Sequence, residues 1–256
     1  MPDDWSFNPW ALSRWFAEPE RDAARDTARM GGGLAAPSLA DVLQPASPVV
    51  DPDDYAPADW YARLSENWPT IANVIPADKQ VTSRDTDVVL DWVNKSLAAD
   101  KQRTSIQCFH YAKYQMHVAE YDISGPPAID SYSILVIREY RRGGGTTPEL
   151  QLMEAVRAVT YIRTSLEAGR PVMIGVKIDG YEDEPNNIWG TPYVIATDHF
   201  VVAVGLGVDG DRPYVNIYDY LNEHNVDDRL FLTPLVILES DQIGYRMIEM
   251  RESYPR

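Results

Sequence analysis

Three things are scarce in this chain of 256 residues: cysteine, basic side chains and long hydrophobic runs. A single cysteine excludes an intramolecular disulfide. With 23 Lys and Arg against 39 Asp and Glu, the formal net charge is −16, which disfavours nucleic acid or an anionic membrane surface as a partner. The longest apolar runs, such as residues 200–206, are far shorter than the roughly 18 residues of a membrane helix. We therefore expect neither a nucleic-acid nor a membrane partner.

Signals for export, metal binding and cofactor binding are also scarce. The acidic start of the chain lacks the basic and apolar regions of a signal peptide, so we expect synthesis in the cytoplasm, with export by another route left open. Asp51, Asp53 and Asp54 lie close together, but no Gly or Glu stands at the offsets of a calcium loop. Gly31-Gly32-Gly33 lacks the lysine and the preceding strand of a phosphate loop. The sequence predicts no metal ion and no cofactor.

The N-terminal part of the chain differs from the rest. Aromatic residues are dense near the start, and prolines recur further on. Pro57 is typical of the first position of a helix, and Pro69 lies beyond the expected end of that helix. We predict a helical, Trp- and Pro-rich extension over residues 1–80, which packs on a main domain of residues 81–256.

Helical patterns dominate the first half of the main domain. Thr82 and Asp85 indicate a capped start. Thr147, Pro148 and Glu149 suit an N-cap and the first turn of a later helix. Gly169 should end the last of these helices, in which Arg157 and Arg163 fall off the apolar stripe and can face water. The predicted helices have apolar faces that include Val89, Trp92, Val93 and Leu97 in the first, Tyr111, Ala112, Gln115 and Met116 in the second (Phe109–Glu120), and Leu152, Ala155, Val156, Val159, Ile162 and Leu166 in the third.

Strand patterns dominate the second half. Asp209-Gly210-Asp211 is flanked by two apolar runs, which predicts a β-hairpin. Helices first and antiparallel strands afterwards indicate an α+β fold. The strands are expected at 133–137, 172–176, 193–195, 200–206, 214–218, 230–238 (interrupted by Pro234) and 245–250.

The only cysteine, Cys108, falls in the first turn of the second predicted helix. The positive end of the helix dipole favours thiolate over thiol at that position. His199 opens an apolar run and can act as a base, and Gln102, six residues before the cysteine, can donate to an oxyanion. The alternative is that Cys108 is a small buried hydrophobe and that His199 is structural.

The order of these residues carries a family resemblance. Gln102, then Cys108 at a helix start, then His199 opening a strand, then Asp219 ending the next strand resembles the papain-like cysteine hydrolase superfamily. The resemblance covers roughly residues 85–250.

Two segments, 168–176 and 198–205, resemble the bacterial branch of that superfamily, which includes leader peptidases of bacteriocin exporters and papain-fold toxins and effectors. The resemblance implies a papain-like fold, in which N-terminal helices, including the helix of the nucleophile, pack on a C-terminal antiparallel sheet.

The resemblance also implies a role for each residue. Cys108 would be the nucleophile, and His199 would take its proton and later protonate the leaving amine. Asp219 would orient the imidazole, and Gln102 would line the oxyanion hole with the backbone N–H of Cys108. Other residues could take these roles: Gln107 as the oxyanion donor, His224 as the base and Asp198 as the acid.

The implied activity is cleavage of a peptide, isopeptide or amide bond through a thioester, for instance by a bacterial toxin or effector. A cell-wall peptide amidase, a glutamine deamidase or transglutaminase, and a catalytically inactive binding module are the alternatives. The expected partner is a peptide or protein substrate, and an immunity or inhibitor protein stays open. The acidic residues Glu182, Asp183 and Glu184 suggest a lid that attracts peptides carrying Lys or Arg.

Overall fold

The computed structural model describes residues 57–123, 134–136, 138–141, 149–150, 152–178, 193–194, 197, 199–222, 228–242 and 244–256. Several sequence predictions lie outside these residues: the Trp-rich start with its glycine triplet and aspartates, the acidic residues 182–184, and the rival residues Asp198 and His224.

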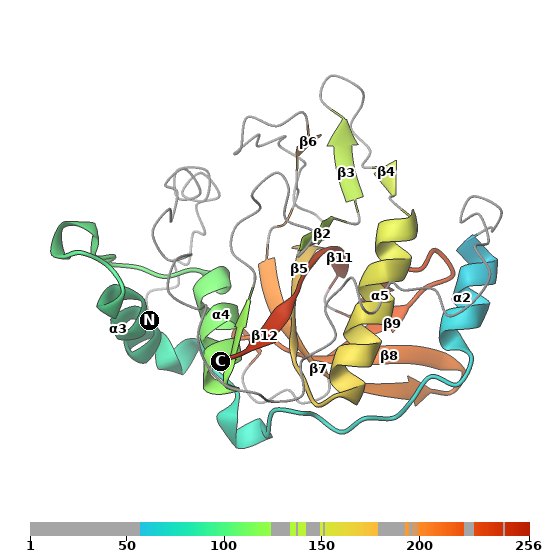
Figure 1. Cartoon of the computed structure of the whole chain (residues 1–256), viewed down its shortest axis with the longest axis horizontal. Coiled ribbons are helices and arrows are strands. Elements are labelled where there is room, and N and C mark those ends of the chain that lie inside the picture. The colour runs from blue at the N-terminus through green and yellow to red at the C-terminus, as the bar shows by residue number, and fades with distance from the viewer. Residues whose placement is uncertain are drawn as a thin grey trace, which may run out of the picture.

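Four α-helices precede or flank the main sheet of the described chain (Figure 1). None of them is long and apolar enough to cross a membrane. They are α2 (Pro57–Ser65), α3 (Thr86–Lys95), α4 (Cys108–Val118) and α5 (Leu152–Glu167), with short 3₁₀ helices η4 (Ala77–Lys79), η5 (Ser83–Asp85) and η6 (Ala99–Lys101) between them.

Local capping signals set two of the helix boundaries. The N–H of Thr82 donates to Asp85 Oδ2 at 2.8 Å, and the N–H of Arg84 donates to Thr82 Oγ1 at 3.3 Å, which confirms the predicted capping box before α3. Gly169 adopts a φ of 76° after α5. The N–H of the next residue, Arg170, then bonds the carbonyl of Ser165 at 2.8 Å, so the predicted stop is confirmed.

The predicted start of α5 is wrong. Glu149 was expected in the first turn of the helix, but Glu149–Leu150 form strand β4, and α5 begins at Leu152. Glu149 pairs with Glu139, and Leu150 pairs with Arg138, both in strand β3 (Arg138–Arg141). This pairing with the preceding strand outweighs the local helix-start signal. Thr147 and Pro148 themselves lie outside the described residues.

The main sheet is antiparallel and closes on itself. Its order is β10-β9-β8-β7-β5-β11-β2, and β10 also pairs with β11, so six of the seven strands form a ring. Two small sheets, β1-β12 and β4-β3-β6, complete the described part. The remaining bounds are β1 (Tyr121–Ile123), β2 (Ile134–Val136), β5 (Val172–Ile178), β6 (Tyr193–Val194), β7 (His199–Asp209), β8 (Arg212–Tyr218), β9 (Arg229–Leu232), β10 (Leu238–Glu239), β11 (Tyr245–Arg251) and β12 (Ser253–Pro255).

Strand β7 separates two cores and brings α4 to the sheet. Alternate side chains of a strand point to opposite faces. Val201 and Ala203 pack in the core that includes α5, whereas Phe200, Val202 and Val204 pack in the core that includes α4. The predicted hairpin from β7 to β8 is confirmed, with Gly210 at a φ of 64°. Helices and an antiparallel sheet are thus present, and the papain-like arrangement stays a prediction.

The described part of the N-terminal extension, residues 57–80, packs on the main sheet. Trp68 Nε1 donates to the carbonyl of Tyr214 at 3.3 Å, and Ile71 forms a β-bridge with Leu206. The extension therefore shares a core with the strands, and its predicted boundary at residue 80 remains untested.

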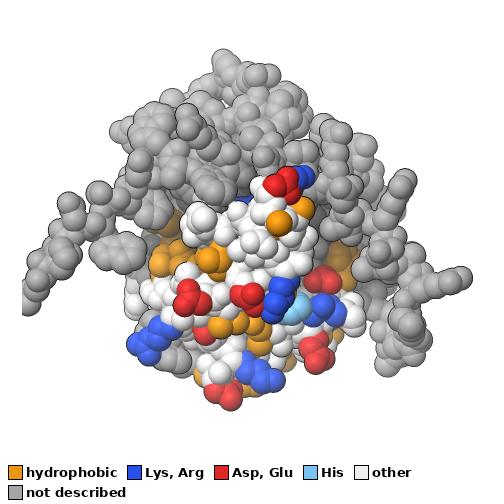
Figure 2. Space-filling view, turned by 90° about the vertical axis from the view of Figure 1, so that its left-hand side faces the viewer, with side chains coloured by type: hydrophobic (Ala, Val, Ile, Leu, Met, Phe, Trp, Pro, Cys, Tyr) orange, Lys and Arg blue, Asp and Glu red, His pale blue; other side chains and the backbone are white. Residues whose placement is uncertain are grey.

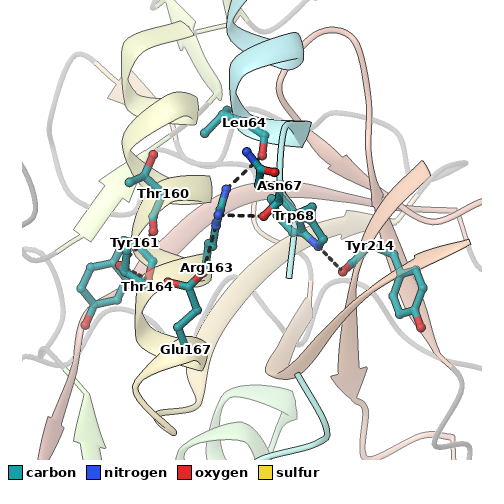
Figure 3. Close-up of polar contacts among 9 residues, drawn as sticks. All are labelled: Leu64, Asn67, Trp68, Thr160, Tyr161, Arg163, Thr164, Glu167 and Tyr214. Carbon is teal, nitrogen blue, oxygen red and sulfur yellow. Dashed lines mark hydrogen bonds and ion pairs between the residues drawn. The ribbon is translucent and has the colours of Figure 1, made fainter. Parts of the chain in front are cut away.

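Arg163 of α5 hydrogen-bonds the C-terminal end of α2 (Figure 3). Its guanidinium donates to the carbonyl of Leu64 at 3.3 Å, to the carbonyl of Asn67 at 3.0 Å and to Glu167 Oε1 at 3.1 Å. Arg163 keeps part of its side chain exposed, at 24%, and it also satisfies carbonyls at a helix end that lack helical partners. Arg157 forms a surface pair with Glu154.

Candidate active site

Helix α4 begins at Cys108, and its first turn is held by an unusual cap. The residue before it, Gln107, has an extended backbone, with φ at −126°. Its carbonyl accepts the N–H of His110 at 2.9 Å, and its own N–H donates to His110 Nδ1 at 3.1 Å. Cys108 is partly buried. The backbone on both sides of the thiol is therefore fixed by hydrogen bonds.

His110 can accept that bond because it stays neutral. Burial lowers the pKa of His110 to about 4, and the positive charges of Arg103 and Lys113 add to the effect. A neutral imidazole keeps one nitrogen as an acceptor. His110 is thus a capping residue of the Cys108 helix.

His199, the first residue of β7, is in contact with both Asp219 and Cys108. Its Nε2 lies 2.9 Å from Asp219 Oδ1, and the two side chains are 4% and 0% exposed. Burial lowers the pKa of His199, but hydrogen bonds and opposite charge from Asp219 and Cys108 outweigh it and raise the pKa to about 10. The structure thus brings together three of the predicted site residues, from α4, from β7 and from the end of β8.

The carboxylate of Asp219, directly after β8, is surrounded by donors. Oδ1 also accepts the N–H of Leu221 at 3.0 Å, and Oδ2 accepts the hydroxyl of Tyr245 at 2.6 Å. Burial raises the pKa of Asp219, but hydrogen bonds from His199, Tyr245 and Leu221, together with the charge of His199, hold it below its ordinary value. Asp219 is therefore an ionised partner for the imidazole at neutral pH.

The backbone of Asp219 is anchored as well. Gln80 is buried, and its Nε2 donates to the carbonyl of Asp219 at 3.1 Å and to that of Asn222 at 3.3 Å. Gln115 of α4 bonds the same segment, since its Oε1 accepts the N–H of Val81 at 2.5 Å. The segment just before α3 therefore connects the cysteine helix to the loop that carries the acid.

Two tyrosine rings contact the imidazole. The ring centroids of Tyr220 and Tyr245 lie 5.6 and 5.4 Å from that of His199. Tyr220 in turn stacks on Tyr111 of α4, with 4.1 Å between centroids and 6° between planes. Burial raises the pKa of both Tyr220 and Tyr245, so their hydroxyl groups keep their protons. Sequence reasoning missed both residues, although Tyr220 directly follows the predicted acid.

A buried ion pair lies against the residues that follow Cys108 and His199. The guanidinium of Arg251 lies 5.1 Å from the ring centroid of Phe109 and 5.3 Å from that of Phe200. Arg251 Nε also donates to Glu249 Oε1 at 3.0 Å, and these side chains are 8% and 2% exposed. Phe109 follows Cys108 and Phe200 follows His199, so this contact holds the start of α4 against the start of β7.

Gln102, the predicted oxyanion donor, lies on the chain between α3 and α4. Gln102 directly follows the short helix η6 and is exposed. Its place in an oxyanion hole stays a prediction. Within the described ranges there is no group of three or more His, Cys, Asp or Glu side chains that could hold a metal ion.

One face of the molecule, on the side of α3 and α4, mixes both signs of charge (Figure 2). Among the described side chains, drawn in colour, acidic and basic groups are interspersed with small hydrophobic areas. That face gives no preference for a highly charged partner of either sign.

Comparison of the chain with models of protein families, with curated proteins and with solved structures finds no match.

Proposed function

We propose that this protein is a cysteine hydrolase of papain-like arrangement, which cleaves a peptide, isopeptide or amide bond through a thioester. One observation carries the proposal. The buried imidazole of His199 hydrogen-bonds Asp219 through Nε2 and also hydrogen-bonds Cys108, which begins helix α4. A nucleophile whose base is oriented by a third group is the arrangement that activates thiols and hydroxyls for acyl transfer.

The contacts define the role of each ring nitrogen. Because Nε2 faces Asp219, Nδ1 is the nitrogen left to exchange a proton with Cys108. The sulfur attacks the carbonyl carbon, and the proton passes from the imidazolium to the leaving amine as the C–N bond breaks. Water then attacks the thioester, gives a proton to His199, and releases the acid and Cys108. Throughout, Asp219 holds the ring in one orientation and stabilises its charge.

The oxyanion would be stabilised by the N–H of Cys108 at the positive end of α4 and by the side chain of Gln102. Gln102→Ala is expected to lower kcat by roughly one to three orders of magnitude with little effect on KM, the usual cost of removing one such donor. Gln107→Ala should matter less, because the papain-like resemblance assigns the donor to Gln102. Steady-state kinetics showing the reverse order would assign the donor to Gln107.

Thiol alkylation tests the proposal without a known substrate. Iodoacetamide should modify Cys108 of the native protein at neutral pH much faster than it modifies the unfolded chain, because the charged imidazole favours the thiolate. His199→Ala should abolish that advantage, whereas His117→Ala, in the same helix as Cys108, should not. Slow modification of the native protein, or no effect of His199→Ala, would contradict the proposal.

Product analysis then separates the reactions that one thioester permits. The native protein and Cys108→Ala are incubated with protein substrates, basic peptides and muropeptides, and the products are analysed by mass spectrometry. New termini in peptides indicate a peptidase, cleaved muropeptides indicate a cell-wall amidase, and ammonia without chain cleavage indicates a deamidase. Turnover by Cys108→Ala equal to that of the native protein would refute a cysteine mechanism.

A further inference from the structure

The two oxygens of the Asp219 carboxylate have different partners. The side chain is 0% exposed. Oδ1 accepts from His199 Nε2 at 2.9 Å and from the N–H of Leu221 at 3.0 Å. Oδ2 accepts from the hydroxyl of Tyr245 at 2.6 Å. The tyrosine therefore secures the oxygen that does not face the imidazole, and so determines which oxygen does.

Tyr245 reaches this position through the closure of the sheet. It is the first residue of β11, 26 residues after Asp219. Strand β11 pairs with β5 on one side and with β10 on the other, and these pairings complete the ring of strands. The side chain is buried, and its ring also lies 5.4 Å from that of His199. Tyr245 thus contacts both the acid and the base.

The hydroxyl of Tyr245 is the donor in this bond. Burial and the charge of Asp219 raise the pKa of Tyr245, so it keeps its proton, while an ionised carboxylate can only accept. A bond of 2.6 Å between a hydroxyl and a carboxylate is in the range of charge-assisted hydrogen bonds, which are roughly twice as strong as neutral ones.

We propose that Tyr245 is a positioning residue of this site, whose hydroxyl orients the ionised Asp219 carboxylate so that it holds the His199 imidazole toward Cys108. The inference rests on the proposed function, because it concerns the base of the same reaction.

Loss of the Tyr245 hydroxyl should change the protonation of Asp219 and, through it, the reactivity of Cys108. Without it, Oδ2 of this buried carboxylate keeps no donor from the described residues, so Asp219 takes up a proton at a higher pH. A neutral acid no longer stabilises the imidazolium, so Cys108 should become reactive only at higher pH. The titratable groups that face Asp219 and His199 are Cys108 from α4, Tyr220 after β8 and Tyr245 from β11. Around them, Tyr111 of α4 interacts with Tyr220, and Asp228 before β9 interacts with Tyr245.

The experiment compares Tyr245→Phe with a matched control, Tyr161→Phe. Tyr161 lies in α5, and its buried hydroxyl donates to the carbonyl of Ser253 at 3.4 Å and accepts the N–H of Ser253 at 3.0 Å. Both variants lose a buried tyrosine hydroxyl, but only one of them loses a bond to Asp219. The rate of Cys108 alkylation by iodoacetamide is measured from about pH 4 to 9, and thermal unfolding verifies that each variant is folded.

Tyr245→Phe is expected to move the acid limb of the rate profile to higher pH and to slow alkylation near pH 6 by about tenfold, the scale of one hydrogen bond to a charged group. Tyr161→Phe should lower the unfolding temperature and leave the limb in place. In an Asp219→Asn background, Tyr245→Phe should have no further effect on the limb, because it acts through the carboxylate.

An unmoved limb in Tyr245→Phe, a limb moved equally in Tyr161→Phe, or an undiminished effect in the Asp219→Asn background would overturn the inference. Each of these results would leave the proposed function standing, provided that alkylation of the native protein depends on His199. Alkylation that does not depend on His199 would overturn the proposed function, and this inference with it.

Discussion

The imidazole of His199 should remain protonated far above the pH at which histidines ordinarily lose their charge. Burial opposes the charge, but hydrogen bonds to Asp219 and Cys108 and their negative charge raise the pKa of His199 from 6.5 to about 10. Each pKa unit corresponds to about 1.36 kcal/mol, so the charged form gains on the order of 5 kcal/mol over the neutral form on folding. This preference is large enough to measure directly.

The raised pKa of His199 makes the stability of the folded protein depend on pH. A group whose pKa is higher in the folded state contributes stability that is complete below its unfolded pKa, here about pH 6.5, and that is lost as pH rises through about 10. The free energy of unfolding should therefore fall across this interval. In Asp219→Asn the fall should be smaller, because the neutral amide no longer stabilises the imidazolium.

Nuclear magnetic resonance of the histidine rings provides the assay, with His199→Gln to assign the signal. The native protein should show His199 titrating near pH 10 and His110 near pH 4, the latter a result of burial. Asp219→Asn should lower the pKa of His199, since burial then has less opposition, and should leave His110 unchanged. A His199 signal that titrates at or below pH 6.5 in the native protein would refute the reasoning.

Three further predictions concern stability. Arg251→Met should lower the free energy of unfolding by about 3–5 kcal/mol, because it leaves the buried Glu249 unpaired. Adding Glu249→Leu should recover much of this loss, and denaturant unfolding in which the double variant is no more stable than Arg251→Met would contradict the prediction. Gly175→Ala should cost about 1–3 kcal/mol, since its methyl group would lie 2.5 Å from Cγ of Glu249, and an unchanged unfolding temperature would count against that crowding. Arg163→Ala should lower the free energy of unfolding by about 1–3 kcal/mol, because it removes hydrogen bonds to backbone carbonyls. Arg157→Ala breaks only a surface pair and should lower it by at most about 1 kcal/mol, so equal losses in thermal unfolding would contradict the assigned role of Arg163.

Features that depend on neighbouring residues could be predicted from the sequence. The capping box of Thr82 and Asp85, the stop at Gly169 and the hairpin around Gly210 are each formed by a few consecutive residues. The start of α4 at Cys108 belongs to the same class, because polar residues before an apolar stripe indicate where a helix begins.

Features that depend on a partner in another element could not be predicted from the sequence. The signal for a helix start at Glu149 is genuine, but pairing with β3 makes this residue part of a strand. The side chain of Arg163 is polar and off the apolar stripe, yet it bonds the end of α2 about a hundred residues earlier. The helical pattern of each segment does not show this, because the deciding partner lies in another element, ten residues away for Glu149 and about a hundred for Arg163.

The candidate site shows the same division. The sequence by itself determined which residues have the right chemistry and where the local backbone places them: a thiol in a first helical turn, a histidine at the start of a strand and an aspartate at the end of the next one. Only the tertiary structure decided that Cys108 and Asp219 meet on one imidazole, because α4 packs on one face of β7 while β8 returns beside it. Only closure of the sheet added Tyr245, since a hydrogen bond between strands depends on their arrangement in space and leaves no periodic pattern in the chain.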